Sequence, residues 1–239
     1  MKLNAIHTLR GALELVTGLH IGGGSDEMHI GGTDNPVVKH PYTQEPFIPG
    51  SSLKGRMRSL LEWRAGIVGP CEGQPLSVKA LSKLSGEQER LARRIAQLFG
   101  VAGQADDALA IELGPTRLSF WDCSLQRSWV KDRNEANQLY TESKSENMID
   151  RIRGGAEHPR QTERVPAGAV FEFRLSVREL EGDQDLLDDV LAGMKLMELD
   201  GIGGSGSRGY GKIRFSSLEL NGDSVQTRYD ALQPFGQVA

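Results

Sequence analysis

The stretch Gly201-Ile-Gly-Gly-Ser-Gly-Ser-Arg-Gly-Tyr-Gly211 separates two segments with different apolar patterns. Residues 185–199 carry apolar side chains at helical spacing, whereas residues 212–219 alternate polar and apolar side chains as a strand does. The chain therefore runs from a helix through a glycine-rich loop into a strand. This order argues against both nucleotide-binding folds that use such loops, because each places a strand before the loop and a helix after it.

Within this loop the sequence matches parts of two nucleotide fingerprints. The run from Gly204 to Gly209 fits the dinucleotide pattern, and the run from Gly206 fits a P-loop until Ile213, which stands where Ser or Thr must bind Mg²⁺. We therefore do not expect a stand-alone nucleotide enzyme. Backbone amides free of side chains can still surround an anion, and Arg208 adds a cation, so we expect phosphate binding here. The alternative is a plain connection between helix and strand.

The rest of the chain completes an α+β pattern. Strands are expected at 6–17, 116–122, 169–177 and 212–219, and helices from Ser51 or Ser52 onward, at 86–99 and at 185–199. Residues 18–50 form a long loop rich in glycine and proline, and such loops are uncommon unless they are functional. Residues 126–164 are polar with weak periodicity and look like an excursion from the core. This order predicts a ferredoxin-like α+β sandwich.

The composition of the 239 residues is that of an ordinary globular protein, with 38% hydrophobic and 25% charged residues. No segment is apolar enough to span a membrane, and the N-terminus lacks the apolar region of a signal peptide. Cys71 and Cys123 stand far apart and fit free thiols in a reducing cytoplasm. The net charge of −4 argues against nucleic acid, but basic residues cluster at 54–58, 151–164 and 208–214, which favours a local anionic partner.

A basic helix start gives a second candidate site. The run Pro49-Gly-Ser-Ser-Leu-Lys-Gly-Arg-Met-Arg58 places three cations in the first two turns of a helix, where the helix dipole disfavours positive charge. A phosphate on the free backbone amides and on the hydroxyls of Ser51 and Ser52 would resolve this conflict. Lys54 and Arg58 share a helix face at i, i+4 spacing. We therefore expect phosphate binding, with a solvated basic face as the alternative.

The long loop at 18–50 holds an acid in a glycine- and proline-flanked turn, Asp34, within Gly-Gly-Thr-Asp-Asn-Pro. From the residues alone, an Asx-turn in which Asp34 hydrogen-bonds its own backbone is the favoured interpretation. The nearby acids and histidines match no metal-ligand spacing, so the metal ligands stay unassigned. His20 follows the first strand at a glycine bend, and it can contact phosphate or cap the strand end.

Together these segments resemble the RAMP-superfamily backbone subunit of type III-A (Csm) CRISPR–Cas effector complexes. Six stretches occur in the family's order across nearly the whole chain, and the set is specific although no single stretch is decisive. They are 17–22 (TGLHIG), 32–37 (GTDNPV), 47–58 (FIPGSSLKGRMR), 98–100 (LFG), 160–168 (RQTERVPAG) and 199–211 (LDGIGGSGSRGYG). The related type III-B subunit shares the glycine loop, whereas the whole set fits type III-A better.

The resemblance implies a single RAMP domain over 1–239, with an RRM-like core, a catalytic loop region at 18–50 and a thumb insertion at 126–164. It implies an endoribonuclease subunit that cuts bound target RNA at regular intervals. The family's cleavage residue corresponds to Asp34 in this sequence. In the family the cut needs Mg²⁺ or another divalent cation. It leaves a cyclic phosphate, which implies that the 2′-OH of the RNA is the nucleophile. Asp34 would position or deprotonate that hydroxyl, or hold a hydrated cation. The alternative is a non-catalytic RNA-binding scaffold, if Asp34 only forms a turn.

The resemblance also implies partners and RNA contacts. Copies of the chain would stack as a filament along a CRISPR RNA. The further partners would be target RNA, a large signature subunit, a small helical subunit and end-capping RAMP subunits, and no membrane would be involved. The acidic helix at 185–200 would then be a solvated outer face. The residues expected to bind RNA are His20, Ser51, Ser52, Lys54, Arg58, Gly203, Gly204, Ser205, Gly206, Ser207, Arg208 and Tyr210.

Overall fold

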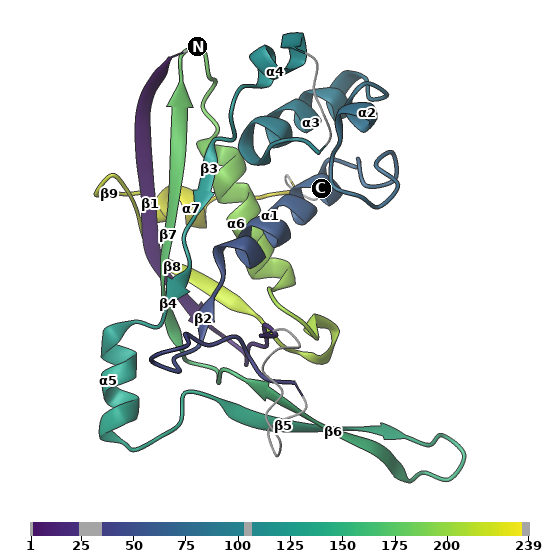
Figure 1. Ribbon diagram of the computed structural model, residues 1–239, viewed down its shortest axis with the longest axis vertical. Helices are drawn as coiled ribbons and strands as arrows, with labels where there is room; N and C mark the ends of the chain where they lie inside the picture. Colours follow the sequence, from purple (N-terminus) through teal and green to yellow (C-terminus); the bar gives the residue numbers. More distant parts are fainter. Residues whose placement is uncertain (1, 24–34, 103–106, 236–239) are drawn as a thin grey trace.

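The computed structural model describes residues 2–23, 35–102 and 107–235 (Figure 1). The strands and helices expected from periodicity are all present. They are β1 (Leu3–Leu15), α1 (Gly50–Arg64), α3 (Gly86–Phe99), β3 (Leu118–Phe120), β7 (Val170–Leu180), α6 (Leu187–Asp200) and β8 (Ile213–Leu220). The other elements are β2 (Phe47–Ile48), α2 (Val78–Leu81), α4 (Asp107–Leu113), β4 (Cys123–Ser124), α5 (Arg127–Glu135), β5 (Glu142–Ile149), β6 (Ala156–Arg164), β9 (Asp223–Ser224) and α7 (Gln226–Asp230). Within these described ranges, none of the helices has the length and apolar character needed to cross a membrane.

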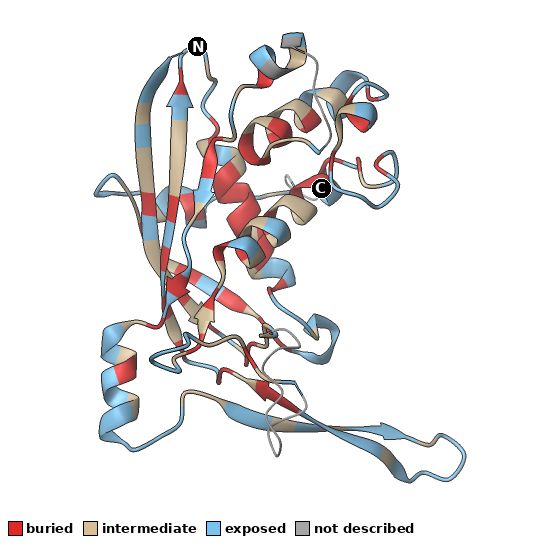
Figure 2. Cartoon of the chain, viewed as in Figure 1, coloured by how far each residue is buried: buried red, intermediate tan, exposed pale blue. Residues whose placement is uncertain are grey.

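The main sheet is antiparallel, with strand order β3-β7-β1-β8-β9. In β1 and β7 the buried apolar residues are separated by exposed or half-buried ones, in keeping with the alternating sequence. The helices α1, α3 and α6 lie on the same side of the sheet, and the buried residues gather between the two layers (Figures 1 and 2). Two strand–helix–strand passes with this strand order make the ferredoxin-like α+β core that the sequence predicts.

Close packing of α1 on α6 fixes the helical layer against the sheet. A Cβ on Gly193 of α6 would lie 2.7 Å from Cγ of Met57 on α1, so only glycine allows this approach. On the sheet side, the rings of Phe173 and Phe215 meet edge to face with centroids 4.9 Å apart. The start of the glycine loop, which follows α6 directly, is therefore held at a fixed distance from α1.

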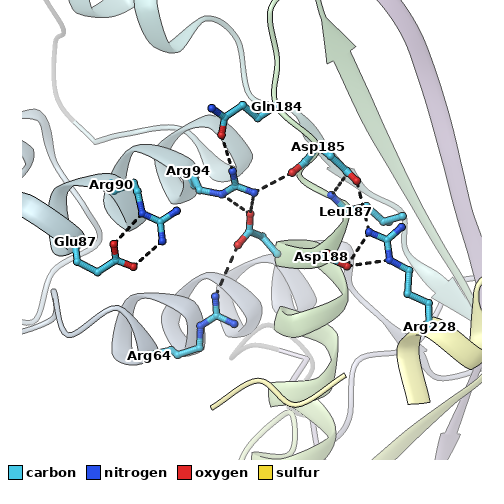
Figure 3. A network of polar contacts seen from close by, with 10 residues as sticks. Arg64, Glu87, Arg90, Arg94, Gln184, Asp185, Leu187, Asp188 and Arg228 are labelled. Atoms are coloured by element: carbon cyan, nitrogen blue, oxygen red, sulfur yellow. Dashed lines mark hydrogen bonds and ion pairs between the residues drawn. The ribbon is translucent and has the colours of Figure 1, made fainter. Parts of the chain in front are cut away.

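A network of charged side chains joins α3, α1 and the start of α6 (Figure 3). Arg94 donates to the Asp189 carboxylate at 2.7 Å, to the Asp185 carbonyl at 2.9 Å and to Gln184 at 3.1 Å. Asp189 also faces Arg64 of α1, with an N–O separation of 3.7 Å. Asp189 is thus part of the packing between helices, whereas Asp185, Asp188 and Asp200 are exposed, so the expected solvated acidic face is present only in part.

The hairpin of β5 and β6 projects away from the core (Figure 1). Its strands pair from Glu142 opposite Arg164 to Ile149 opposite Ala156, with an irregularity after Glu146. Most of its residues are exposed on both sides (Figure 2). This explains why the sequence predicted only a weakly periodic excursion at 126–164: with no buried face, strands have no alternating apolar pattern.

Candidate nucleic-acid interface

Three segments meet just beyond the end of β1: residues 18–20, the glycine loop (residues 201–211) and the base of the β5–β6 hairpin. Leu19 and Val165 exchange two backbone hydrogen bonds, of 2.9 and 2.8 Å. On the other side, the Gly204 N–H donates to the His20 carbonyl at 2.9 Å. Residues 18–20 therefore lie between the glycine loop and the hairpin and connect them.

The glycines of the loop fall into two groups. A Cβ on Gly203 would lie 2.5 Å from the His20 carbonyl oxygen, and a Cβ on Gly211 would lie 1.9 Å from the Ile202 carbonyl oxygen. These two glycines are needed for folding. In contrast, Gly206 has open space where a Cβ would stand, so its missing side chain is available for close approach by a ligand.

Arg208 connects the glycine loop to the hairpin. Its Nε lies 3.0 Å from the Glu146 carboxylate of β5, and its guanidinium also donates to the Ser205 hydroxyl. Ser205 has φ 62°, a left-handed conformation that is uncommon for serine and turns the loop outward at this point. The half-buried Ser205 and the exposed Gly206, Ser207 and Arg208 thus form a cationic tip of the loop.

Tyr210 was expected to contact RNA, but the structure places its side chain inside the protein. Its ring is fully buried, with Lys144 Nζ 4.4 Å and Arg164 Cζ 5.1 Å from the ring centroid. Both cations belong to the hairpin, one on each strand. Tyr210 therefore anchors the hairpin by cation–π contacts and offers no exposed face on which a base could stack.

The start of α1 is only partly free for an anion. The Gly50 N–H donates to the Asp122 carboxylate at 2.7 Å, so a side chain of the β3–β4 connection already caps this amide. Ser51 is exposed, while Ser52 and Lys54 are half-buried. The expected phosphate site therefore contains a carboxylate that the sequence did not suggest, and phosphate binding by these three residues stays a prediction.

The other two cations of this helix start have partners inside the chain. Arg58 donates to the buried Glu62 carboxylate at 2.8 Å and to the Leu76 carbonyl at 3.0 Å. Arg56 donates to the Gly201 carbonyl at 2.9 Å and pairs with Asp200, so α1 begins beside the glycine loop. Arg58 thus holds residues 62–76 in place. The sequence had instead predicted that Arg58 is exposed and contacts phosphate.

Glu163 organises the base of the hairpin. Its carboxylate accepts hydrogen bonds from Lys39 Nζ and the Thr141 hydroxyl, each at 2.6 Å, and from the Val37 N–H at 2.9 Å. Burial opposes its ionisation, but these hydrogen bonds and the charge of Lys39 hold the pKa of Glu163 below its usual range. His20 Nδ1 lies 2.7 Å from the Glu163 carbonyl oxygen.

Asp34, the expected catalytic residue, lies outside the described residues. The next residue, Asn35, accepts a hydrogen bond from the Glu163 N–H at 3.1 Å and forms a bridge with Thr162. The segment that follows Asp34 is thus attached to the hairpin base. Among the residues that the structure describes, no three His, Cys, Asp or Glu side chains gather so as to hold a metal ion.

The sequence did not single out three residues that organise this interface: Glu163, Asp122 and Glu146. Glu163 lies in the 160–168 stretch that carries the family resemblance, but no local pattern shows that it binds residues 37–39, more than 120 positions away. Asp122 and Glu146 likewise act on distant segments. Of the three residues, only Glu163 could have been found from the sequence, because it lies in the 160–168 stretch that carries the family resemblance.

Comparison with known proteins shows the family of this chain. The family model of the RAMP superfamily matches residues 12–214. The relatives include a "CRISPR system Cms endoribonuclease Csm3" from Methanothermobacter thermautotrophicus, 37% identical over 95% of this chain and 90% of that protein. Another protein of the same name, from Streptococcus thermophilus, is 38% identical over 91% of this chain and 90% of its own length.

Solved structures show the same fold. A Csm3–Csm4 subcomplex of a type III-A CRISPR–Cas interference complex matches with a TM-score of 0.55 and 28% identity, over 92% of this chain and 80% of that chain. The crystal structure of Methanopyrus kandleri Csm3 matches with a TM-score of 0.58 and 25% identity, over 91% of this chain and 78% of that one. The fold is thus that of a RAMP protein. Within the RAMP superfamily, this chain belongs to the Csm3 family of CRISPR endoribonucleases.

Proposed function

We propose that this chain is the CRISPR RNA-binding backbone subunit of a type III-A complex, and that it cuts complementary target RNA at regular intervals. The observation that carries this proposal is the junction of residues 18–20, the glycine loop and the hairpin base, to which Asn35 is also attached. It brings a cationic loop tip, a projecting hairpin and the chain next to Asp34 into one region. The endoribonuclease names of the relatives support the activity.

We propose that the guide RNA backbone lies along the glycine-loop tip and the start of α1. Arg208, Lys54 and the exposed Ser51 supply donors for phosphate, and the open side of Gly206 lets the RNA approach the backbone. His20 Nε2 is a further candidate contact: because Nδ1–H donates to the Glu163 carbonyl, Nε2 of the neutral ring is an acceptor, suited to a ribose 2′-OH. Such contacts recognise the RNA backbone and therefore accept any guide sequence.

For the cut, we propose that Asp34 acts on the 2′-OH of the target RNA next to the scissile phosphate. One carboxylate suffices, because the substrate supplies the nucleophile and a held backbone supplies the in-line geometry. Asp34 and RNA phosphate oxygens would also be the ligands of Mg²⁺ or another divalent cation, which proteins often hold by one carboxylate and substrate phosphates. Bound there, the cation would offset the charge on the reacting phosphate.

We further propose that copies of the chain stack head to tail along the guide in the cytoplasm, with the large, small and end-capping subunits of the complex. The structural neighbour that contains Csm3 together with Csm4 supports partners of this type. A head-to-tail contact is heterologous and open-ended, as a filament requires.

The test is co-expression of the chain with the products of its neighbouring genes, followed by purification of the assembly. We expect a discrete small RNA to co-purify, and a labelled RNA complementary to it to be cut at evenly spaced positions when Mg²⁺ is added. If no RNA co-purifies, guide binding is wrong. If the guide is present and a bound target stays intact, the chain is a non-catalytic scaffold instead.

A further inference from the structure

Arg208, the cation in the glycine-loop tip, already has an anionic partner within the chain. Its Nε lies 3.0 Å from Oε2 of Glu146, and the side chains are 59% and 21% exposed, respectively. A phosphate that binds Arg208 must therefore compete with this carboxylate. Because the ion pair is partly exposed, it is weak enough to be exchanged for another anion.

Glu146 also lies beside a second group, the hydroxyl of Tyr210. This hydroxyl is buried and has no hydrogen-bond partner of good geometry among the described residues. A buried hydroxyl without a partner is unfavourable and rare in folded proteins. Burial opposes ionisation of Glu146, but the neighbouring Tyr210 hydroxyl and the charges of Arg208 and Lys144 hold its pKa below the usual range. Glu146 is therefore an ionised acceptor with an unsatisfied donor close by.

The hairpin has a weak point where such an exchange could take place. The register between β5 and β6 shifts between Glu146 and Met148, so the strand pairing is irregular next to this carboxylate. At the hairpin base, Lys144 and Arg164 hold the Tyr210 ring. The Glu146 side chain can therefore change partner without loss of the contacts that anchor the hairpin.

We propose that RNA phosphate and Glu146 compete for Arg208, and that RNA binding at the glycine loop transfers Glu146 from Arg208 to the Tyr210 hydroxyl. Glu146 is then a positioning residue, which acts on RNA only through Arg208. The hairpin is tied to the loop tip in the RNA-free protein and is released from it when a phosphate arrives. This inference rests on the proposed binding of RNA by the glycine loop.

Binding of a fluorescein-labelled oligouridine to the full chain tests this competition. Glu146→Gln should tighten binding about two- to five-fold, the range expected when a part-exposed ion pair no longer opposes binding. Arg208→Ala should weaken binding, and the double variant should bind as Arg208→Ala does, because Glu146 acts through Arg208. Glu157→Gln is the matched control: it removes the same charge from the same hairpin and should change affinity less than two-fold.

The outcomes separate this inference from the proposed function. If the wild-type chain binds no RNA, the proposed function fails. If Arg208→Ala weakens binding while Glu146→Gln leaves it unchanged, only the competition fails. If Glu146→Gln still tightens binding without Arg208, or Glu157→Gln has the same effect, general charge removal explains the result and the proposal is wrong.

Hydrogen exchange gives a second, independent measurement of the hairpin's release. Backbone amides of residues 146–148, at the irregularity, should exchange faster in wild-type protein saturated with oligouridine, and equally fast in Glu146→Gln without RNA. In Tyr210→Phe the RNA-free exchange should stay at the wild-type level, while affinity should fall about two- to five-fold because the released carboxylate no longer accepts a hydrogen bond from the Tyr210 hydroxyl. Unchanged exchange in Glu146→Gln would overturn the proposed release.

Discussion

At the scale of single residues, the glycine loop separates positions needed for folding from positions available to a ligand. Gly203 has φ 73°, and a Cβ there would lie 2.5 Å from the His20 carbonyl oxygen. Gly206 is not left-handed, and no atom lies within 4 Å of the place of its Cβ. The same residue type in one short loop thus serves two different purposes.

Two alanine substitutions test this separation. Gly203→Ala should destabilise the fold by roughly 1–3 kcal/mol, because it adds both backbone strain and a clash. Gly206→Ala should leave the free energy of unfolding within about 0.5 kcal/mol and yet weaken RNA binding, because the methyl group blocks the approach of the RNA backbone. Urea unfolding and RNA binding are the measurements. Wild-type RNA affinity in Gly206→Ala would mean that this position only connects helix and strand.

Glu163 makes a prediction about pH. The pKa of Glu163 is lowered in the folded state, so its stabilising contribution is present above the unfolded value, about 4.3, and is lost as pH falls through the folded value. Glu163→Gln should therefore cost roughly 1–3 kcal/mol at pH 7, and its deficit relative to wild type should shrink below about pH 4.3. Urea unfolding at several pH values measures this, with Glu157→Gln as control. A deficit that does not change with pH would contradict the assigned role.

At the scale of elements, the sequence predicts those with one buried face and misses those without. β1, β7 and β8 alternate because each has one face on the core, and α3 has a clear apolar side. The hairpin has almost no buried side chains, so nothing in its periodicity marks it as two strands. The residues themselves predicted an excursion from the core at 126–164, and the resemblance to a family added that this excursion is a thumb insertion.

The sequence predicted the separate segments of the candidate site but not the contacts between them. Glycine content, charge and order along the chain identify the glycine loop and the α1 start. They do not show that Arg58 is directed to Glu62 and Leu76, or that Tyr210 lies under the hairpin, because those contacts depend on segments brought together by folding. Cations and aromatic residues near a site are used for packing as readily as for binding.

The network of Figure 3 gives a prediction at this scale. Asp189→Asn should destabilise the protein by roughly 1.5–3 kcal/mol, because Arg94 and Arg64 lose their shared anion at the contact of α3, α1 and α6. Glu87→Gln breaks the Glu87–Arg90 ion pair, which lies on the exposed face of α3, and should have no measurable effect. Thermal unfolding compares the two. Equal effects would show that the network contributes no more than a surface pair.

At the scale of the whole molecule, the net charge of −4 conceals how charge is distributed. Acids near the start of α6 are paired within the chain: Asp189 with Arg64 and Arg94, and Asp188 with Arg228. The cationic groups around the glycine-loop tip lie at the other end of α6, beside the projecting hairpin. A protein of negative net charge can therefore present a local surface suited to RNA.

If the chain is a filament subunit, the number of bound copies should follow guide length. Light scattering on the chain mixed with single-stranded guides of increasing length should report complexes whose mass rises in steps of one subunit. Open-ended, heterologous contacts predict this behaviour, whereas a closed assembly gives one size. A single copy on every guide, however long, would contradict the proposed stacking.

The most direct test of the account is the rate at which the assembled complex cuts a complementary RNA when Asp34 is replaced by alanine. Loss of a group that positions or accepts a proton in the reaction is expected to slow the cut by about 10²–10⁴-fold. The complex with Asp34→Ala should assemble and bind target as wild type does, and Asp223→Ala, an exposed acid of β9, should cut at the normal rate. Regularly spaced cuts at the wild-type rate in the Asp34→Ala complex would contradict the central claim.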